Sequence, residues 1–148
     1  MMTKEKDVTK PSAESYERIQ KGLKLRTLYV KSFSGQINLE VVTKAVKALT
    51  VSISSTADFR YKPKDEVEVT QKWEVVARDK SSKSECLNIS VTYCVVLHSK
   101  ERFTKGFFRV FERTSLPFNM WPFVREFVNN MTARMNVPPL TLPLSKTP

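Results

Sequence analysis

Alternating apolar and polar positions run through the middle of the chain. Between residues 51 and 97, three segments place an apolar residue at nearly every second position. This period of two is typical of β-strands that bury one face. The connections between these segments are short and polar, so the strands are expected to pair antiparallel. Their apolar faces carry Val51, Ile53, Phe59 and Tyr61, then Val67, Val69, Trp73 and Val75, then Leu87, Ile89, Val91, Tyr93, Val95 and Leu97.

A fourth strand is predicted over residues 22–33, although apolar groups also fall on its second face. The polar residues 1–15 are predicted to form a flexible N-terminal segment, with extended chain from Tyr16. Residues 38–49 place Leu39, Val42, Val46 and Leu49 at helical spacing. Their β-branched content leaves a short helix and an irregular crossover both open.

Two helices are expected to cover the apolar face of this sheet. Residues 104–113 bring three phenylalanines together on a predicted helix, but Gly106 and Val110 leave a continued strand as the alternative. The second helix is predicted to begin near Asn119, with Pro122 close to its first turn, and to run to about Met135. The predicted fold class is therefore α+β, with a four-stranded antiparallel sheet and two helices in a domain over residues 16–144 and a short tail over 145–148.

The 148 residues carry a formal charge of +10 at neutral pH. This charge permits either nucleic acid or an acidic protein as partner. No apolar run approaches the roughly 20 residues that cross a bilayer, and the polar start lacks the core of a signal peptide. We therefore expect a cytoplasmic protein without membrane insertion. Cys86 and Cys94 would lie roughly 26 Å apart along one strand, too far for a disulfide.

Catalytic chemistry has little material in this sequence. His98 is the only histidine, and no glycine-rich phosphate loop is present. Three carboxylates, Glu66, Glu68 and Glu74, fall at even spacing on the polar face of one predicted strand, where a solvated surface accounts for them. We therefore expect no enzyme, no cofactor and no metal site.

The C-terminal stretch carries the most specific pattern of the chain. Residues 119–128 read Asn-Met-Trp-Pro-Phe-Val-Arg-Glu-Phe-Val, Arg134 follows, and residues 137–143 read Val-Pro-Pro-Leu-Thr-Leu-Pro. This stretch of about 25 residues resembles the closing helix and tail of the SecB family of chaperones. The positions that carry the resemblance are Pro122, Arg125, Glu126, Pro138 and Leu140.

The resemblance implies a dimer of dimers that holds unfolded client polypeptides in hydrophobic grooves without ATP. Its first helix would pack at the subunit interface, which makes Phe107, Phe108 and Phe111 the candidate interface residues. The candidate groove residues are Phe33, Ile37, Leu39, Val42, Trp121, Phe127 and Met131. For Trp121, Phe127 and Met131, burial in the core is an equally open reading, since buried apolar residues are the norm.

The basic charge departs from the acidic SecB proteins of general export. It favours the SecB-like branch that serves toxin–antitoxin–chaperone modules, in which the client is a labile antitoxin. One alternative is a general export chaperone that delivers preproteins to the translocase. Another, from a different class, is a nucleic-acid-binding module. The aromatic residues share a face with the aliphatic ones, which favours a core over a base-stacking surface.

Overall fold

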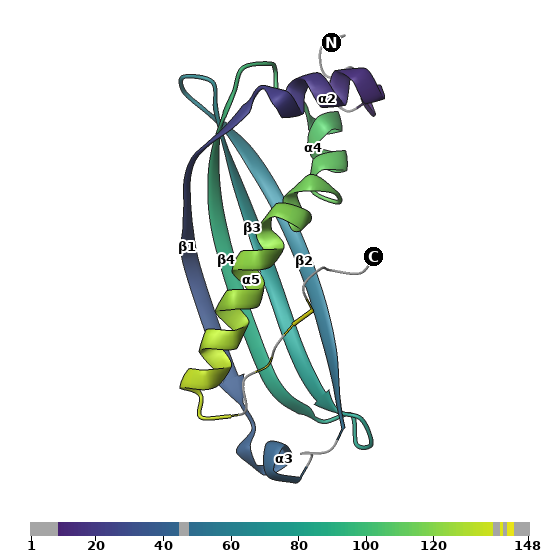
Figure 1. The fold of residues 1–148 in the computed structure, drawn as a ribbon, viewed down its shortest axis with the longest axis vertical. Helices are drawn as coiled ribbons and strands as arrows, with labels where there is room; N and C mark the ends of the chain where they lie inside the picture. The colour runs from purple at the N-terminus through teal and green to yellow at the C-terminus, as the bar shows by residue number, and fades with distance from the viewer. Residues whose placement is uncertain (1–8, 45–47, 138–139, 141, 144–148) are drawn as a thin grey trace. The chain divides into compact units, whose positions relative to one another are not determined.

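The computed structural model describes residues 9–44, 48–137, 140, 142 and 143. Four strands form one antiparallel sheet in the order β1-β4-β3-β2, so β1 and β2 are its edge strands. Figure 1 shows the elements in chain order. They are α2 (Ala13–Lys21), β1 (Leu23–Ile37), α3 (Leu39–Lys44), β2 (Leu49–Lys62), β3 (Glu66–Asp79), β4 (Glu85–Ser99), α4 (Lys105–Phe111) and α5 (Ser115–Arg134).

The chain divides into two compact units, and every strand contributes a segment to each. The first unit comprises Met1–Tyr29, Ala57–Thr70 and Cys94–Met120. The second comprises Val30–Thr56, Gln71–Tyr93 and Trp121–Pro148. Helix α5 likewise has its first six residues in the first unit and the remainder in the second.

Aromatic side chains form the core of the first unit. Phe103 has its ring centroid 5.0 Å from that of Phe107, and Phe59 packs at 4.6 Å from Phe108. Helix α4 begins at Thr104, whose hydroxyl accepts a hydrogen bond from the Phe107 N–H at 3.0 Å. This capping satisfies a backbone donor at the start of the helix. Residues 104–113 therefore contain a helix, and the alternative of a continued strand is wrong.

The predicted extended chain from Tyr16 is wrong, because residues Ala13–Lys21 form helix α2. Ser12 caps the helix by accepting a hydrogen bond from the Ser15 N–H at 3.2 Å. Its apolar face buries Ile19 and stacks Tyr16 on Phe107 at 4.8 Å. The sequence contains signals for this helix, namely a capping serine, an acidic first turn and a basic last turn. The prediction instead began the extended chain at Tyr16, although the alternation of apolar residues starts only at Leu23.

The core of the second unit lies between the sheet and α5. Trp73 of β3 and Trp121 of α5 pack with ring centroids 5.8 Å apart, and both side chains are buried. The predicted start of this helix is wrong, because α5 begins at Ser115 instead of near Asn119. Pro117 therefore occupies the first turn, where a missing N–H costs little, and Pro122 lies inside the helix.

The connection from β1 to β2 contains a short helix. Helix α3 spans Leu39–Lys44, and the Asn38 side chain accepts a hydrogen bond from the Val41 N–H at 3.4 Å. Val46 lies outside the described residues, and Leu49 already belongs to β2, so the helix is shorter than its apolar spacing predicted. Among the described helices, none has both the length and the apolar character needed to cross a membrane.

Candidate functional site

Within the second unit, helix α5 carries two apolar stripes that differ in burial. Residues four apart on a helix share a face. The first stripe contains Val124 and Val128, both fully buried, together with buried Trp121 and Thr132. The second stripe consists of Phe123, which is 44% exposed, and the half-buried Phe127, Met131 and Met135. The fold of the chain thus covers the second stripe only in part.

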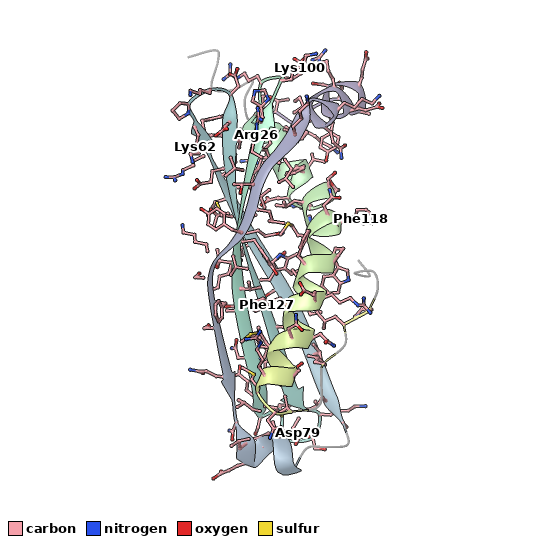
Figure 2. All side chains as sticks on the ribbon, turned by 60° about the vertical axis from the view of Figure 1, so that its left-hand side comes forward. Arg26, Lys62, Asp79, Lys100, Phe118 and Phe127 are labelled. Carbon is pink, nitrogen blue, oxygen red and sulfur yellow. The ribbon has the colours of Figure 1, made fainter. Side chains whose placement is uncertain are left out.

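Edge strand β1 borders this second stripe. The rings of Phe33 and Phe127 meet edge to face with centroids 5.7 Å apart, yet Phe33 remains 60% exposed. Figure 2 shows Phe127 projecting from α5 on the side of β1. Gly35 provides the space for Met135, because a Cβ atom at Gly35 would collide with the Met135 Cε atom. We call Phe33, Phe123, Phe127, Met131 and Met135 the α5–β1 surface.

Three further candidates for the groove follow β1 along the chain. Leu39 at the start of α3 is 65% exposed, and Ile37 and Val42 are half-buried. The backbone N–H of Asn38 donates to the Cys86 carbonyl at 2.8 Å, which fixes the entry into α3 beside β4. The exposed apolar positions therefore continue from β1 into the crossover.

Trp121, a predicted groove residue, instead holds the C-terminal tail. Its side chain is 2% exposed, and its Nε1–H donates to the Pro143 carbonyl at 2.8 Å. Arg125 donates through Nε to the Leu142 carbonyl at 2.8 Å. The Leu140 N–H donates to the Thr132 hydroxyl at 2.9 Å. These three hydrogen bonds bind the tail to α5, so Trp121 has almost no surface to offer a client.

The remaining predicted residues occupy different environments. Phe107, Phe108 and Phe111 are 0, 6 and 6% exposed in the core of the first unit, which leaves them little surface for a second copy. Pro122 and Glu126 are exposed on α5, and Pro138 lies outside the described residues. Packing within one chain thus accounts for the three phenylalanines, and their role in a subunit interface stays a prediction.

Phe123 and Met135 belong to the α5–β1 surface but were not among the predicted groove residues. Both could have been found from Phe127 and Met131, since the four residues follow one another at intervals of four. Gly35 carries no such signal. Its role depends on Met135, which lies 100 positions further along the chain. Only the folded chain brings these two residues together.

Burial and nearby charges shift the pKa values of two side chains of the sheet, Tyr93 and Glu68. In the second unit, burial and, to a smaller extent, the charge of Glu126 raise the pKa of Tyr93 to about 12. In the first unit, Glu68 is 8% exposed and pairs with Arg60 at 2.9 Å and Lys62 at 3.3 Å. Burial opposes ionisation of Glu68, but Lys62 and Arg60 outweigh it and lower its pKa. The predicted solvated position of Glu68 is therefore wrong.

The described residues meet the requirements of an apolar surface and not those of a metal site. Within residues 9–44 and 48–137, no three His, Cys, Asp or Glu side chains come together as a metal-binding group would require. The α5–β1 surface instead presents the exposed rings of Phe33 and Phe123 beside half-buried Phe127, Met131 and Met135, all of which are apolar.

The fold is similar to that of a solved SecB-like chaperone. The solved structure of the SecB-like chaperone Rv1957 from Mycobacterium tuberculosis, in complex with a ChAD peptide from the Rv1956 HigA1 antitoxin, superposes with a TM-score of 0.72. The two chains are 14% identical, and the match covers 89% of this chain and 96% of that one.

A protein of unknown function from Streptococcus agalactiae is also similar, with a TM-score of 0.44 and 14% identity over 82% of this chain and 97% of that one. No protein-family model matches the chain, and no curated protein matches its sequence. The likeness to Rv1957 therefore concerns the fold.

Proposed function

We propose that this protein is an ATP-independent holdase chaperone that binds unfolded polypeptide on the α5–β1 surface. The observation that carries the proposal is the incomplete cover of this surface, above all Phe33 at 60% and Phe123 at 44% exposure. Contiguous exposed apolar residues mark sites of interaction in soluble proteins. The fold supports the proposal, because a SecB-like chaperone of similar structure binds a peptide.

The composition of the α5–β1 surface suits a client of variable sequence. Met131 and Met135 have flexible, polarizable side chains that repack around different apolar groups. Phe123 and Phe127 add flat rings that bury large apolar areas at little cost in side-chain entropy. A client held in this way contacts the chaperone through apolar side chains. Such contacts form without a nucleotide.

We further propose a dedicated client, namely the antitoxin of a toxin–antitoxin–chaperone module. Two observations support this choice. The peptide bound to Rv1957 comes from an antitoxin. The formal charge of +10 distinguishes this chain from a chaperone that presents an acidic face to an export motor. The module would operate in the cytoplasm.

We also propose that the protein assembles as a dimer of dimers. Edge strand β1 exposes Leu25 by 60%, Tyr29 by 49% and Val30 by 39%, in addition to Phe33. A long edge strand with exposed apolar side chains invites association unless another chain covers it. Assembly would leave part of this apolar surface for the client and bury the rest.

The test is suppression of aggregation by the purified protein without nucleotide. A chemically unfolded client is diluted into buffer with and without the chaperone, and light scattering is followed. Phe123→Asp and Phe127→Asp are expected to weaken suppression by roughly tenfold in the concentration required, because a charge would enter an apolar contact. Leu49→Asp is the matched control, since Leu49 is 49% exposed in the second unit but lies outside the α5–β1 surface.

Two outcomes would contradict the holdase. One is failure of the wild-type protein to slow aggregation at a several-fold molar excess. The other is equal activity of the folded Phe123→Asp and Phe127→Asp variants and the wild type, which would remove the α5–β1 surface from the mechanism. The dedicated client is tested separately, by asking whether the gene lies beside a toxin–antitoxin pair and whether co-expression extends the half-life of that antitoxin.

A further inference from the structure

A hollow of about 420 Å³ in the first unit is lined by cationic side chains from two segments. Arg109 and Arg113 come from α4 and the turn after it, and Lys10 comes from the chain before α2. The other described residues of the lining are Gly106, Val110 and Thr114. Among the described residues, three cationic side chains and no carboxylate line this hollow.

The opposite side of α4 is fully used by the core. Phe107, Phe108 and Phe111 pack inward against Phe103, whereas Arg109 is exposed. Helix α4 therefore directs its aromatic side to the sheet and its cationic side to the hollow. Arg109 and Arg113 lie about one turn apart along the chain, and like charges at this spacing repel each other. An anion held between Arg109 and Arg113 would relieve this repulsion.

No described carboxylate forms an ion pair with Lys10, Arg109 or Arg113. Glu112, which stands next to Arg113 in the sequence, does not line the hollow. The contrast with Arg60 and Lys62 is direct, because both of those cations pair with Glu68. Within the part of the chain that the structure describes, no carboxylate neutralises the positive charge of the hollow, which can therefore attract an external anion.

Hydrogen bonds hold the wall of the hollow in place. The Thr114 hydroxyl donates to the Val110 carbonyl at 2.7 Å. The Tyr16 and Ser115 hydroxyls lie 2.9 Å apart, and Gln20 donates to the Ser115 hydroxyl at 2.8 Å, so α2 is tied to the start of α5. A site whose walls are already ordered loses less entropy when a ligand binds.

An exposed aromatic ring lies one helical turn beyond the hollow. The Phe118 N–H donates to the carbonyl of Thr114, the residue before α5, at 3.3 Å, which places Phe118 in the first turn of α5, directly after Thr114 on the same side. Phe118 is 77% exposed, and its side chain projects into solvent (Figure 2). The cationic hollow is thus followed by a single apolar contact point.

We propose that this hollow binds an acidic segment of the client polypeptide, with client carboxylates on Arg109 and Arg113 and an adjacent apolar side chain on Phe118. The inference rests on the proposed function and adds the class of client that the chaperone selects. Arginine forms paired hydrogen bonds with carboxylates, which gives such contacts specificity as well as strength. Tyr16 is stacked on Phe107, so it is not available to stack on a nucleic-acid base.

Two fluorescein-labelled peptides of twelve residues test the proposal with the full-length protein. Both contain the same apolar run, preceded by three Asp residues in one peptide and by three Asn residues in the other. Wild type is expected to bind the Asp peptide roughly tenfold more tightly than the Asn peptide in fluorescence anisotropy at low salt. Raising the salt concentration should reduce this difference.

The double variant Arg109→Gln/Arg113→Gln is expected to lose the preference for the Asp peptide and to keep its affinity for the Asn peptide. Arg78→Gln/Lys80→Gln removes the same charge from the second unit and should keep the preference. Arg109→Lys/Arg113→Lys should retain part of it, which separates charge from a loss of folding. Phe118→Ser should weaken both peptides by the same modest factor.

The proposal is overturned if the glutamine variant, folded by circular dichroism, keeps the full preference for the Asp peptide. It is also overturned if a twelve-nucleotide oligothymidine binds wild type more tightly than the Asp peptide and loses that affinity in the same variant. Binding of the Asn peptide reports on apolar contacts, which the α5–β1 surface and Phe118 provide. If wild type fails to bind the Asn peptide while the preference of the hollow persists, the proposed holdase surface fails and the acidic site stands.

Discussion

At the scale of single residues, Glu68 of β3 is a buried acidic side chain. The residue is 8% exposed, and its carboxylate lies between two cations. Arg60 approaches it through Nε and Nη2, both at 2.9 Å, and Lys62 completes the cluster. The alternation of β3 placed Glu68 on a polar face and so predicted a solvated side chain. It did not show that the polar side chains of the neighbouring strand would cover the carboxylate.

Acidification is expected to destabilise the protein through Glu68. Its pKa is lowered in the folded state, so the unfolded state binds more protons as the pH falls below the ordinary value of 4.5. The stabilisation is therefore present above that pH and is lost as the pH falls through the lowered folded value. Urea unfolding at a series of pH values should show a smaller loss of stability over this range for Glu68→Gln than for wild type.

Glu66→Gln is the control for this measurement, because Glu66 lies two residues away on β3 and outside the ion-pair cluster. It should leave the acid-dependent loss in place. Equal pH profiles for wild type and Glu68→Gln would show that the cluster does not couple protonation to folding.

At the scale of elements, β1 packs against the end of α5 where a glycine of β1 faces a flexible methionine side chain. Gly35 leaves the space that the end of the Met135 side chain occupies. Two residues further back on β1, Phe33 meets Phe127. Both contacts lie within the α5–β1 surface, so the position of β1 against this part of α5 also determines how much of the surface stays exposed.

Gly35→Val is expected to destabilise the protein by about 1–3 kcal/mol, the range for an overpacked site. The added branched side chain would displace the end of Met135, and Met135→Ala in the same chain should recover part of the loss. The free energy of unfolding in urea measures both effects. Ser34→Val, at an exposed neighbouring position, should change it little. A double variant no more stable than Gly35→Val would contradict the assigned contact.

The elements differ in how far the sequence alone predicted them. Strands β2, β3 and β4 were predicted close to their observed bounds, because alternation is a local property of each segment. The bounds of the helices were less accurate. Tertiary contacts of Tyr16 and Ile19 stabilise α2, and α5 begins at Ser115 with Pro122 in its interior. The local sequence pattern contains no information about such contacts, because their partners lie far away in the sequence.

For the molecule as a whole, a tetramer is the expected species. Exposed apolar side chains on β1 would be covered in an assembly, and light scattering after size exclusion should give four times the 17.1 kDa of one chain. Tyr29→Glu combined with Val30→Glu should shift the distribution to smaller species, whereas Lys24→Glu on the same strand should not. A monomer at micromolar concentrations of wild type would refute the assembly.

The sequence by itself determined the class of fold and the features that carry it. The period of two in β2, β3 and β4 and the C-terminal pattern around Pro122 and Arg125 are both local. The first predicted an antiparallel sheet, and the second resembled the SecB family. The charge of +10 likewise follows from composition, and it restricted the choice of partner.

Only the tertiary structure decided which apolar residues of α5 face solvent. Trp121 and Phe127 are chemically alike and lie six positions apart, yet Trp121 is buried against Trp73 and bound to the tail, whereas Phe127 stays half-exposed beside Phe33. Their partners lie from 22 to 94 positions away. Burial is a property of those distant contacts, so sequence spacing could identify the candidates for client binding but could not choose between them.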